Sequence, residues 1–506
     1  AANSLLNQYS KSIRYGFALR SLFSGLLIPF GFAPFHLPGL AILGIALLFL
    51  QLRNQSLKQS FKIGFFFGMG FLSLGVSWIH VSIHSYGHLN TIFSAFITLI
   101  FIAYLAVFPG LGAFCYQAIA SKRSLLLNCF LFSATWCLSE YLRATVLSGF
   151  PWLLLGYGQI DSPLRHLMPI IGVYGVSFIA CFAATLLASS MQAERKKRYL
   201  WIIPCISLII GPSLLKNIEW TSTSDKPVSV GVIQANISMR DKWGESLFWK
   251  ILQRYEKAIS NLMGKAQVIV LPESAIPVPI NYVSDILEGL DLQAKSSGTA
   301  ILLGIPQPTT VDNTAYYNTL TTLGTAQGTY LKQHLVPFGE FIPGPFQTLV
   351  EWLSLPAANL LSGKNNQSLI AVQNSPIASL ICYEIAYPNL LRKQLPEAEW
   401  IVAISDDGWF GHSLAMHQQL QMSQALSLIT GRYQIVANND GLSSVIDNHG
   451  YIVSSLPTFT SDILEAKIYP SSKASPWVKL GDWPTLLISF LLVFVGLFFR
   501  HYKKLI

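Results

Sequence analysis

The stretch IASLICYE, residues 377–384, is a short apolar run that ends in a cysteine, and it indicates the fold class of the chain's second half. Its small and β-branched residues, bounded by turn-forming residues, are typical of a buried strand. Similar runs recur at 228–234, 267–271, 300–304, 400–404 and 433–437, and helical spacing lies between them near 246–264, 280–296 and 414–431. This alternation predicts a layered α/β domain over residues 217–482 rather than a helical bundle.

Outside this domain, long apolar segments dominate the sequence. They lie at roughly 15–33, 36–52, 62–83, 91–119, 124–147, 167–190, 199–215 and 483–499. Each approaches the length needed to cross a bilayer core of about 30 Å. We therefore predict a bundle of seven spans at 1–216, followed after the domain by an eighth span and a tail at 483–506. The first segment lacks a small-residue cleavage site, so we expect it to be retained rather than removed as a signal peptide.

The charges are distributed unevenly between these regions. Residues 1–216 carry 15 Lys and Arg against 3 Asp and Glu, whereas residues 217–499 carry 16 against 22. With eight spans, every basic cluster falls on one side of the membrane, which the positive-inside rule makes the cytoplasm. The whole chain is 52% hydrophobic and only 12% charged. This composition excludes a disordered chain and a nucleic-acid-binding basic protein. The positive-inside rule, applied to the eight spans, predicts that the domain at 217–482 lies outside the cytoplasm.

One of the six cysteines, Cys382, lies in the predicted α/β domain, whereas the others lie in predicted spans. A thiol at the carboxyl end of a strand, facing the next loop, is well placed to act as a nucleophile. An inert cysteine of the core is the alternative.

A carboxylate and an ammonium group could activate this thiol. Glu273 follows a predicted strand in VLPES, residues 270–274, while Lys332 and Glu340 begin and end the stretch KQHLVPFGE. If the strands lie side by side, Glu273 could take the thiol proton and Lys332 could stabilise an oxyanion. The alternative is a surface salt bridge between Glu273 and Lys332, which would contribute little.

The stretches LPES (271–274), KQHLVPFGE (332–340) and ICYE (381–384) resemble the Glu–Lys–Cys signature of the nitrilase superfamily. Combined with eight spans, they resemble its membrane-anchored branch, the apolipoprotein N-acyltransferase family of Gram-negative inner membranes. The resemblance covers nearly the whole chain. It also includes GFPW (149–152), QANI (234–237), KW (242–243), DGWFG (407–411) and NNDG (438–441).

This resemblance implies a four-layer αββα domain joined to a membrane bundle, with Glu273, Lys332 and Cys382 as the catalytic residues. Cys382 would take an acyl chain from the sn-1 ester of a phospholipid and hold it as a thioester. Glu273 would be the general base and Lys332 the oxyanion stabiliser. The α-amine of a diacylglyceryl-cysteine at a lipoprotein N-terminus would then receive the chain. Supporting or substrate-binding roles would fall to Glu340, Tyr383, Glu384, Trp243, Trp409 and Phe410.

We therefore expect a phospholipid donor, a diacylated apolipoprotein acceptor and the lipid bilayer as partners. We expect no cofactor, metal or nucleic acid. The protein would be a monomer of the bacterial inner membrane, with its catalytic domain in the periplasm.

Several alternatives stay open at this stage. A membrane-tethered amidase or nitrilase could use the same residues with water as the acyl acceptor, and a non-catalytic lipoprotein-binding protein could carry them unused. Trp409 and Phe410, between Gly408 and Gly411, predict either a hinged lid or a turn filled by two aromatic rings. The segment 346–361 predicts either a mobile arm that enters the outer leaflet or a helix packed on the domain.

Overall fold

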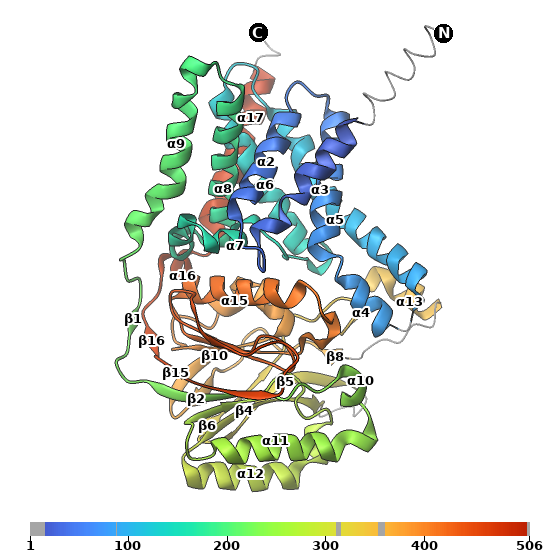
Figure 1. Ribbon diagram of the computed structural model, residues 1–506, viewed down its shortest axis with the longest axis vertical. Helices are drawn as coiled ribbons and strands as arrows, with labels where there is room; N and C mark the ends of the chain where they lie inside the picture. Colours follow the sequence, from blue (N-terminus) through green and yellow to red (C-terminus); the bar gives the residue numbers. More distant parts are fainter. Residues whose placement is uncertain (1–15, 88, 310–314, 353–359, 503–506) are drawn as a thin grey trace. The chain divides into compact units, whose positions relative to one another are not determined.

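The computed structural model describes residues 16–87, 89–309, 315–352 and 360–502 (Figure 1). The chain divides into two compact units. We call Ala1–Ile218 together with Leu480–Ile506 the helical unit, and Glu219–Lys479 the α/β unit.

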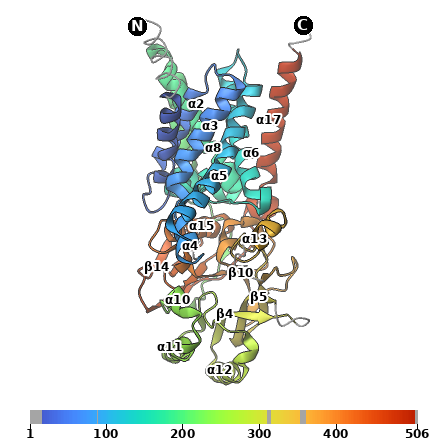
Figure 2. The same ribbon diagram turned by 90° about the vertical axis from the view of Figure 1, so that its right-hand side faces the viewer.

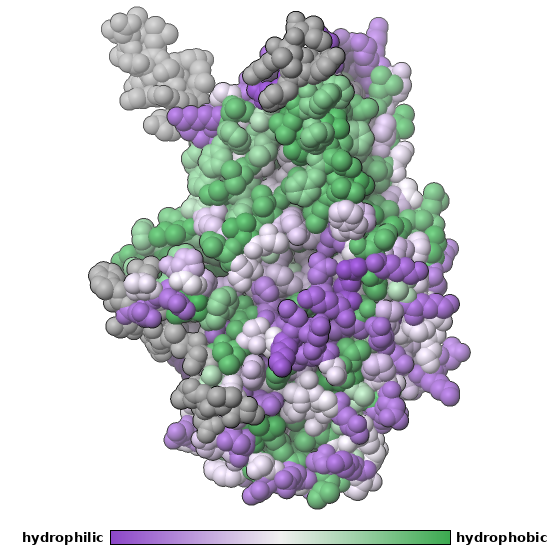
Figure 3. All heavy atoms as spheres, turned by 180° about the vertical axis from the view of Figure 1, so that it is seen from behind, coloured by the Kyte–Doolittle hydropathy of each residue, from purple (hydrophilic) through white to green (hydrophobic). Residues whose placement is uncertain are grey.

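The helical unit consists of apolar helices. Five are long and apolar enough to cross a membrane, judged by length and composition: Leu57–Val76, Thr91–Ile119, Leu125–Ser148, Pro163–Gln192 and Trp483–Arg500. The other three predicted segments form shorter apolar helices, Gly16–Gly31, Pro38–Gln51 and Tyr199–Leu215. Apolar side chains cover much of the surface of these helices, as a surface facing lipid requires (Figure 3).

The elements of the helical unit have these bounds: η1 Pro29–Gly31, α2 Pro38–Gln51, α3 Leu57–Val76, α4 Ile79–Ser85, α5 Thr91–Ile119, α6 Leu125–Thr145, η2 Val146–Ser148, α7 Leu155–Gly158, η3 Gln159–Asp161, η4 Pro163–Leu167, α8 Met168–Gln192, η5 Arg195–Lys197, α9 Tyr199–Ile210, η6 Gly211–Leu215 and α17 Trp483–Tyr502.

The third predicted segment, 62–83, differs from the structure at both ends. Helix α3 begins five residues earlier, at Leu57, because Lys58 and Lys62 are accommodated with exposed side chains in its first turns. It ends at Val76, and the separate short helix α4 follows. At this break the indole Nε1 of Trp78 donates a hydrogen bond to the carbonyl of Gly75 at 3.1 Å.

Two buried charged residues of α6 hold the segment that follows this helix. Arg143 donates to the carbonyls of Phe150 and Trp152, and Glu140 Oε1 accepts from the N–H of Leu155 at 2.7 Å. Both side chains are nearly inaccessible, so their polar groups need such partners. These contacts hold the GFPW stretch, which follows η2, against the end of α6.

The elements of the α/β unit have these bounds: β1 Ser222–Thr223, β2 Val228–Gln234, α10 Met239–Lys242, η7 Glu245–Leu247, α11 Phe248–Leu262, β3 Val268–Val270, η8 Ile280–Tyr282, α12 Ser284–Ser297, β4 Ala300–Pro308, β5 Tyr316–Gly324, β6 Ala326–Gln327, β7 Thr329–Leu331, η9 Gly344–Phe346, α13 Gln347–Trp352, β8 Leu360–Leu361, β9 Ile370–Val372, β10 Ser375–Ile381, η10 Cys382–Ala386, α14 Pro388–Arg392, β11 Ile401–Ser405, η11 Asp407–Phe410, α15 Ala415–Thr430, β12 Gln434–Asn438, β13 Ser444–Ile446, β14 Ile452–Ser455, β15 Asp462–Ile468, β16 Ser471–Ser472 and α16 Pro476–Leu480.

Two large sheets form the centre of this unit. One has the strand order β15-β2-β3-β4-β5-β7, with β8 paired to β5, and the other has the order β14-β13-β12-β11-β10-β9-β6. Strands β2, β3 and β4 run parallel in the first sheet, and β10, β11 and β12 run parallel in the second. Parallel strands bring their carboxyl ends to one edge, and the loops after these strands carry the polar residues described below.

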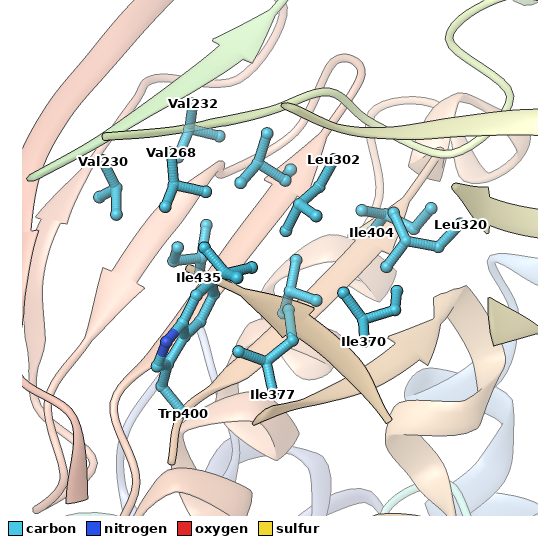
Figure 4. Close-up of a cluster of buried hydrophobic side chains, with 14 of the residues drawn as sticks. Val230, Val232, Val268, Leu302, Leu320, Ile370, Ile377, Trp400, Ile404 and Ile435 are labelled. Carbon is cyan, nitrogen blue, oxygen red and sulfur yellow. The ribbon is translucent and has the colours of Figure 1, made fainter. Parts of the chain in front are cut away.

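Alternation along the strands builds the layers. Val268 (Figure 4) and Val270 of β3 contribute to a core shared by both sheets, whereas Ile269 between them packs with residues of α11 and α12. Helices α11 and α12 lie side by side on the outer face of the first sheet (Figures 1 and 2). On the second sheet, Leu420 of α15 packs against Val436 of β12. The unit is therefore the predicted αββα sandwich.

The predicted arm at 346–361 begins with η9 and α13, and its residues 353–359 lie outside the described part of the chain.

Candidate active site

Cys382 is the first residue after β10 and begins η10. Its backbone has φ 54°, in the left-handed region that residues other than glycine rarely adopt, and its exposed fraction is 8%. Such a strained turn at the end of a buried strand is typical of functional positions, because the surrounding structure must hold it in place. The strand's pairing with β11 ends at Ile381, directly before the cysteine.

Glu384 holds this turn. Its fully buried carboxylate accepts hydrogen bonds from the N–H groups of Ile381 at 2.8 Å, Gln333 at 2.7 Å and His334 at 3.0 Å, and from the hydroxyl of Tyr330 at 3.0 Å. These bonds tie the turn after β10 to the segment after β7. Burial raises the pKa of Glu384 to about 7, although the backbone donors oppose this shift.

Glu273 follows β3 and is also buried. Its Oε1 accepts a hydrogen bond from Asn318 Nδ2 at 2.6 Å, and its Oε2 accepts from the backbone N–H of Asp406 at 3.0 Å. Lys332 Nζ lies 3.7 Å from Glu273 Oε1. Three elements therefore fix both carboxylate oxygens, since the donors come from β5, from the segment after β7 and from the turn after β11.

Lys332 lies between two carboxylates. Besides its contact with Glu273, its Nζ lies 2.9 Å from Glu340 Oε1, and the side chain is only 1% exposed. Asn318 Nδ2 also donates to Glu340 Oε1 at 3.2 Å, while the N–H of Val336 donates to Glu340 Oε2 at 2.8 Å. One ammonium and one amide thus separate the buried Glu273 from the partly buried Glu340, which would otherwise repel each other.

The electrostatics connect Cys382 to this group. Burial raises the pKa of the Cys382 thiol well above its ordinary value; the charge of Glu273 raises it further, and that of Lys332 lowers it. Burial also raises the pKa of Glu273, opposed by Lys332 and reinforced by Glu340. For Lys332, burial lowers the pKa, but Glu340 and Glu273 outweigh it and raise the value overall. At neutral pH the lysine is therefore charged and the thiol protonated, so sulfur needs a base before it can attack.

The expected aromatic residues lie at turns, and only the two tryptophans among them are exposed. Trp243 follows α10 and is 51% exposed, and Trp409 of η11 is 40% exposed. Phe410 is half-buried, and Tyr383 is buried with its ring 5.4 Å from that of Tyr387. Exposed indole rings provide apolar surface that can take up an aliphatic chain.

Sequence reasoning missed two partners of Glu273. Asn318 lies in β5, a strand that the apolar runs did not predict, and its amide contacts both acids of the site. Lys242 was noted only as part of a similar stretch, yet its Nζ donates to the Glu273 carbonyl at 3.0 Å. The available signal for Asn318 was a polar residue within a strand, and that for Lys242 was a lysine next to a tryptophan. In the described ranges, no group of three or more His, Cys, Asp or Glu is arranged to hold a metal ion.

Two family models match the chain. Residues 24–186 match the apolipoprotein N-acyltransferase N-terminal domain, and residues 229–475 match carbon-nitrogen hydrolase. A structural similarity to the Saccharomyces cerevisiae Nit3 protein, a member of branch 10 of the nitrilase superfamily, has a TM-score of 0.36 and 17% identity, covering 50% of this chain and 92% of that chain.

Full-length relatives are more similar. The apolipoprotein N-acyltransferase of Methylococcus capsulatus is 34% identical over 92% of this chain and 93% of its own length. That of Coxiella burnetii is 36% identical over 94% of this chain and 98% of its own length. These matches extend across both units and include the hydrolase-type domain that carries Cys382. The chain therefore belongs to the apolipoprotein N-acyltransferase family.

Proposed function

We propose that the protein transfers a fatty acyl chain from a phospholipid to the amino terminus of a diacylated lipoprotein, in two steps through Cys382. In the first step the sulfur attacks the carbonyl carbon of the sn-1 ester while Glu273 takes the thiol proton. Lys332 stabilises the oxyanion of the tetrahedral intermediate. The carbon–oxygen bond to glycerol then breaks, the leaving oxygen receives the proton, and a lysophospholipid departs.

The second step reverses these roles. The α-amine of the diacylglyceryl-cysteine attacks the thioester carbon, and the carbon–sulfur bond breaks. Glu273 takes a proton from the nitrogen and returns one to the sulfur, which regenerates the thiol. A thioester suits this sequence because sulfur is a good nucleophile toward an ester and a good leaving group toward an amine.

The contact of Lys332 with both Glu273 and Glu340, beside a cysteine at a strained strand end, carries this proposal. A base and a cation that share one buried site with a protonated thiol are what acyl transfer from an ester requires. Glu340 and Glu384 act as supporting residues, since the first contacts Lys332 and the second holds the turn of the nucleophile. The exposed rings of Trp243 and Trp409 would contact the acyl chain.

The surroundings follow from the family and the charge pattern. The basic clusters beside the apolar segments favour an α/β unit on the periplasmic side of the bacterial inner membrane. There the donor phospholipid and the lipoprotein acceptor would both reach the enzyme from the bilayer. We propose that the chain acts as a monomer, because all three catalytic groups come from one α/β unit.

Mass spectrometry of the intact protein tests the first step. After incubation with phosphatidylethanolamine in detergent micelles, we expect the mass to increase by one fatty acyl chain, located at Cys382 by peptide mapping. The variant Cys382→Ala should gain no mass and should not acylate a diacylated lipopeptide. A wild-type protein that acylates the lipopeptide without passing through a modified Cys382 would contradict the proposal.

The same experiment separates the alternative functions. With a membrane-tethered amidase, water would release the chain as free fatty acid even when the lipopeptide is present. With a lipoprotein-binding protein, Cys382→Ala would bind the lipopeptide as wild type does, and neither protein would acquire an acyl group.

A further inference from the structure

A second buried lysine contacts the proposed base. Lys242 is the last residue of α10 and is 4% exposed. Its Nζ donates to the backbone carbonyl of Glu273 at 3.0 Å and forms a buried ion pair with Asp406. A buried ammonium group requires such partners, because it loses its hydration. Lys242 therefore holds the main chain at Glu273.

Asp406, the partner of Lys242, holds the side chain of Glu273. It follows β11, and its N–H donates to Glu273 Oε2 at 3.0 Å. Its own Oδ1 accepts from Gly408 N–H at 3.3 Å and from Asn439 Nδ2 at 3.2 Å. The position of the Glu273 carboxylate thus depends on where the ion pair places Asp406.

Asn439 completes a closed set of contacts. Its Nδ2 donates to the carbonyl of Ile237 at 2.8 Å, and its Oδ1 accepts from the N–H of the same residue at 3.0 Å. Ile237 precedes α10, which ends at Lys242, so the contacts return to their starting point. We call Lys242, Asp406 and Asn439 the lysine hub. It joins the turns after β2, β11 and β12, and these strands belong to both sheets.

We propose that Lys242 is a positioning residue for acyl transfer. It fixes the backbone of Glu273 directly, fixes the Glu273 carboxylate through Asp406, and balances the charge of Asp406 beside that carboxylate. The inference rests on the proposed function of Glu273 as the base. A purely structural ion pair would stabilise the fold without affecting the ionisation of Glu273. The two roles therefore differ in their effect on the pH dependence of the thiol's reaction.

The charges around the base give the direction of this effect. Without Lys242, Asp406 places an uncompensated negative charge beside Glu273 and raises the pKa of Glu273. Without the charge of Asp406, Lys242 is uncompensated and lowers that pKa. These shifts add to the effects of the groups that face Glu273 or Asp406 from the neighbouring elements: Lys332, Glu340, Cys382, Asp407 and Asp440.

The test compares Lys242→Met, Asp406→Asn and the double variant with wild type, all as full-length protein. The acylation rate of Cys382 from phosphatidylethanolamine micelles is measured by mass spectrometry from pH 4 to 9. The control is Lys295→Met, which removes a Lys–Asp pair from the surface of the α/β unit, where Lys295 Nζ lies 2.6 Å from Asp291 and the lysine side chain is 58% exposed.

We expect Lys242→Met to slow acylation by about 100-fold, the order of loss for a misplaced catalytic group. The acidic limb of its pH–rate curve, where the acylation rate falls at low pH, should move to higher pH. The acidic limb of Asp406→Asn should move to lower pH. In the double variant the limb should return toward the wild-type position, and Lys295→Met should match wild type throughout.

A folded Lys242→Met with the wild-type rate and the wild-type limb would overturn the inference. If that variant does not fold, Asp406→Asn decides, because an unshifted limb in this variant also overturns it. Alkylation of Cys382 by iodoacetamide, measured on the same variants and pH values, separates the two proposals. If wild type is alkylated but never acylated by phospholipid, the proposed function fails. Even then, opposite shifts of the acidic limb of the alkylation rate in Lys242→Met and Asp406→Asn would support the positioning role of Lys242.

Discussion

Replacing Lys332 by methionine separates the contribution of this residue to stability from its proposed role in catalysis. Its Nζ lies 2.9 Å from Glu340 Oε1 and 3.7 Å from Glu273 Oε1. At an effective dielectric constant of about 20, each attraction amounts to about 4–6 kcal/mol before the cost of desolvation. Removing the cation leaves the buried Glu273 carboxylate facing the partly buried Glu340 carboxylate, so we expect Lys332→Met to lower the free energy of unfolding by about 3–5 kcal/mol.

The double variant Lys332→Met/Glu340→Gln removes the repulsion but does not restore the cation. We therefore expect it to recover most of the lost stability. The acylation rate of Cys382 should stay about 100–1,000-fold below wild type in both variants, the loss typical of a missing oxyanion stabiliser. The pKa of Lys332 is raised, so its stabilising charge is fully present throughout the neutral range and is lost only at strongly alkaline pH.

Thermal unfolding in detergent gives the stability, and mass spectrometry of the intact protein gives the acylation rate. Both are measured at pH 7 on wild type, the single variant and the double variant. If the double variant recovers acylation together with stability, Lys332 only holds the two acids apart, and its role in oxyanion stabilisation is wrong. If Lys332→Met is as stable as wild type, the argument from buried charge fails.

Three further predictions concern pH and packing. Burial raises the pKa values of Glu384 and Asp407 to about 7, so the stability that their neutral forms provide is complete below about pH 4 and is lost as the pH rises through 7. The variant Glu384→Gln cannot ionise at this position. Thermal melting curves measured across this pH range should therefore lose the contribution of Glu384 to the pH dependence of stability, about 3 kcal/mol. The acylation rate of Cys382 should fall as the pH drops through a midpoint above the ordinary glutamate value of about 4.3, because burial raises the pKa of Glu273, and a rate that stays constant down to pH 4 would refute this. Trp400→Ala should lower the free energy of unfolding by about 3–5 kcal/mol, since its fully buried ring fills the core between the sheets, and should leave the midpoint of the pH–rate curve unchanged.

The sequence predicted the central strands because they are continuous apolar runs. The run predicted at 228–234 coincides with β2. The run predicted at 267–271 extends one residue beyond β3 at each end, and the run predicted at 433–437 is shifted by one residue from β12. Strands such as β5 and β15 were missed because they alternate polar with apolar residues or lie at a sheet edge, so their pairing depends on neighbours distant in sequence. Their existence follows from the sheet rather than from their own composition.

The candidate site shows a similar division. Their positions after predicted strands made Glu273, Lys332 and Cys382 candidates, because the ends of parallel strands converge at one edge, and the resemblance to the nitrilase superfamily implied their roles. The register between β4 and β5 places Asn318 opposite Pro306, and only this register brings its amide to the two acids. A single sequence does not encode such a register visibly. The same is true of Lys242, whose partners Glu273 and Asp406 lie 31 and 164 positions away.

The buried position of Cys382 has a chemical consequence if the α/β unit faces the oxidising periplasm, as proposed. A thiolate is the form of cysteine that reacts with oxidants, and a disulfide or sulfenic acid at this position would block acyl transfer. Burial and the charge of Glu273 keep the thiol protonated, although Lys332 lies close by. In the proposed mechanism the thiolate forms only when Glu273 accepts the proton, and an ester carbonyl bound beside Lys332 would favour that transfer. A raised thiol pKa would therefore protect the proposed nucleophile between turnovers, because the protonated thiol reacts with oxidants more slowly than the thiolate.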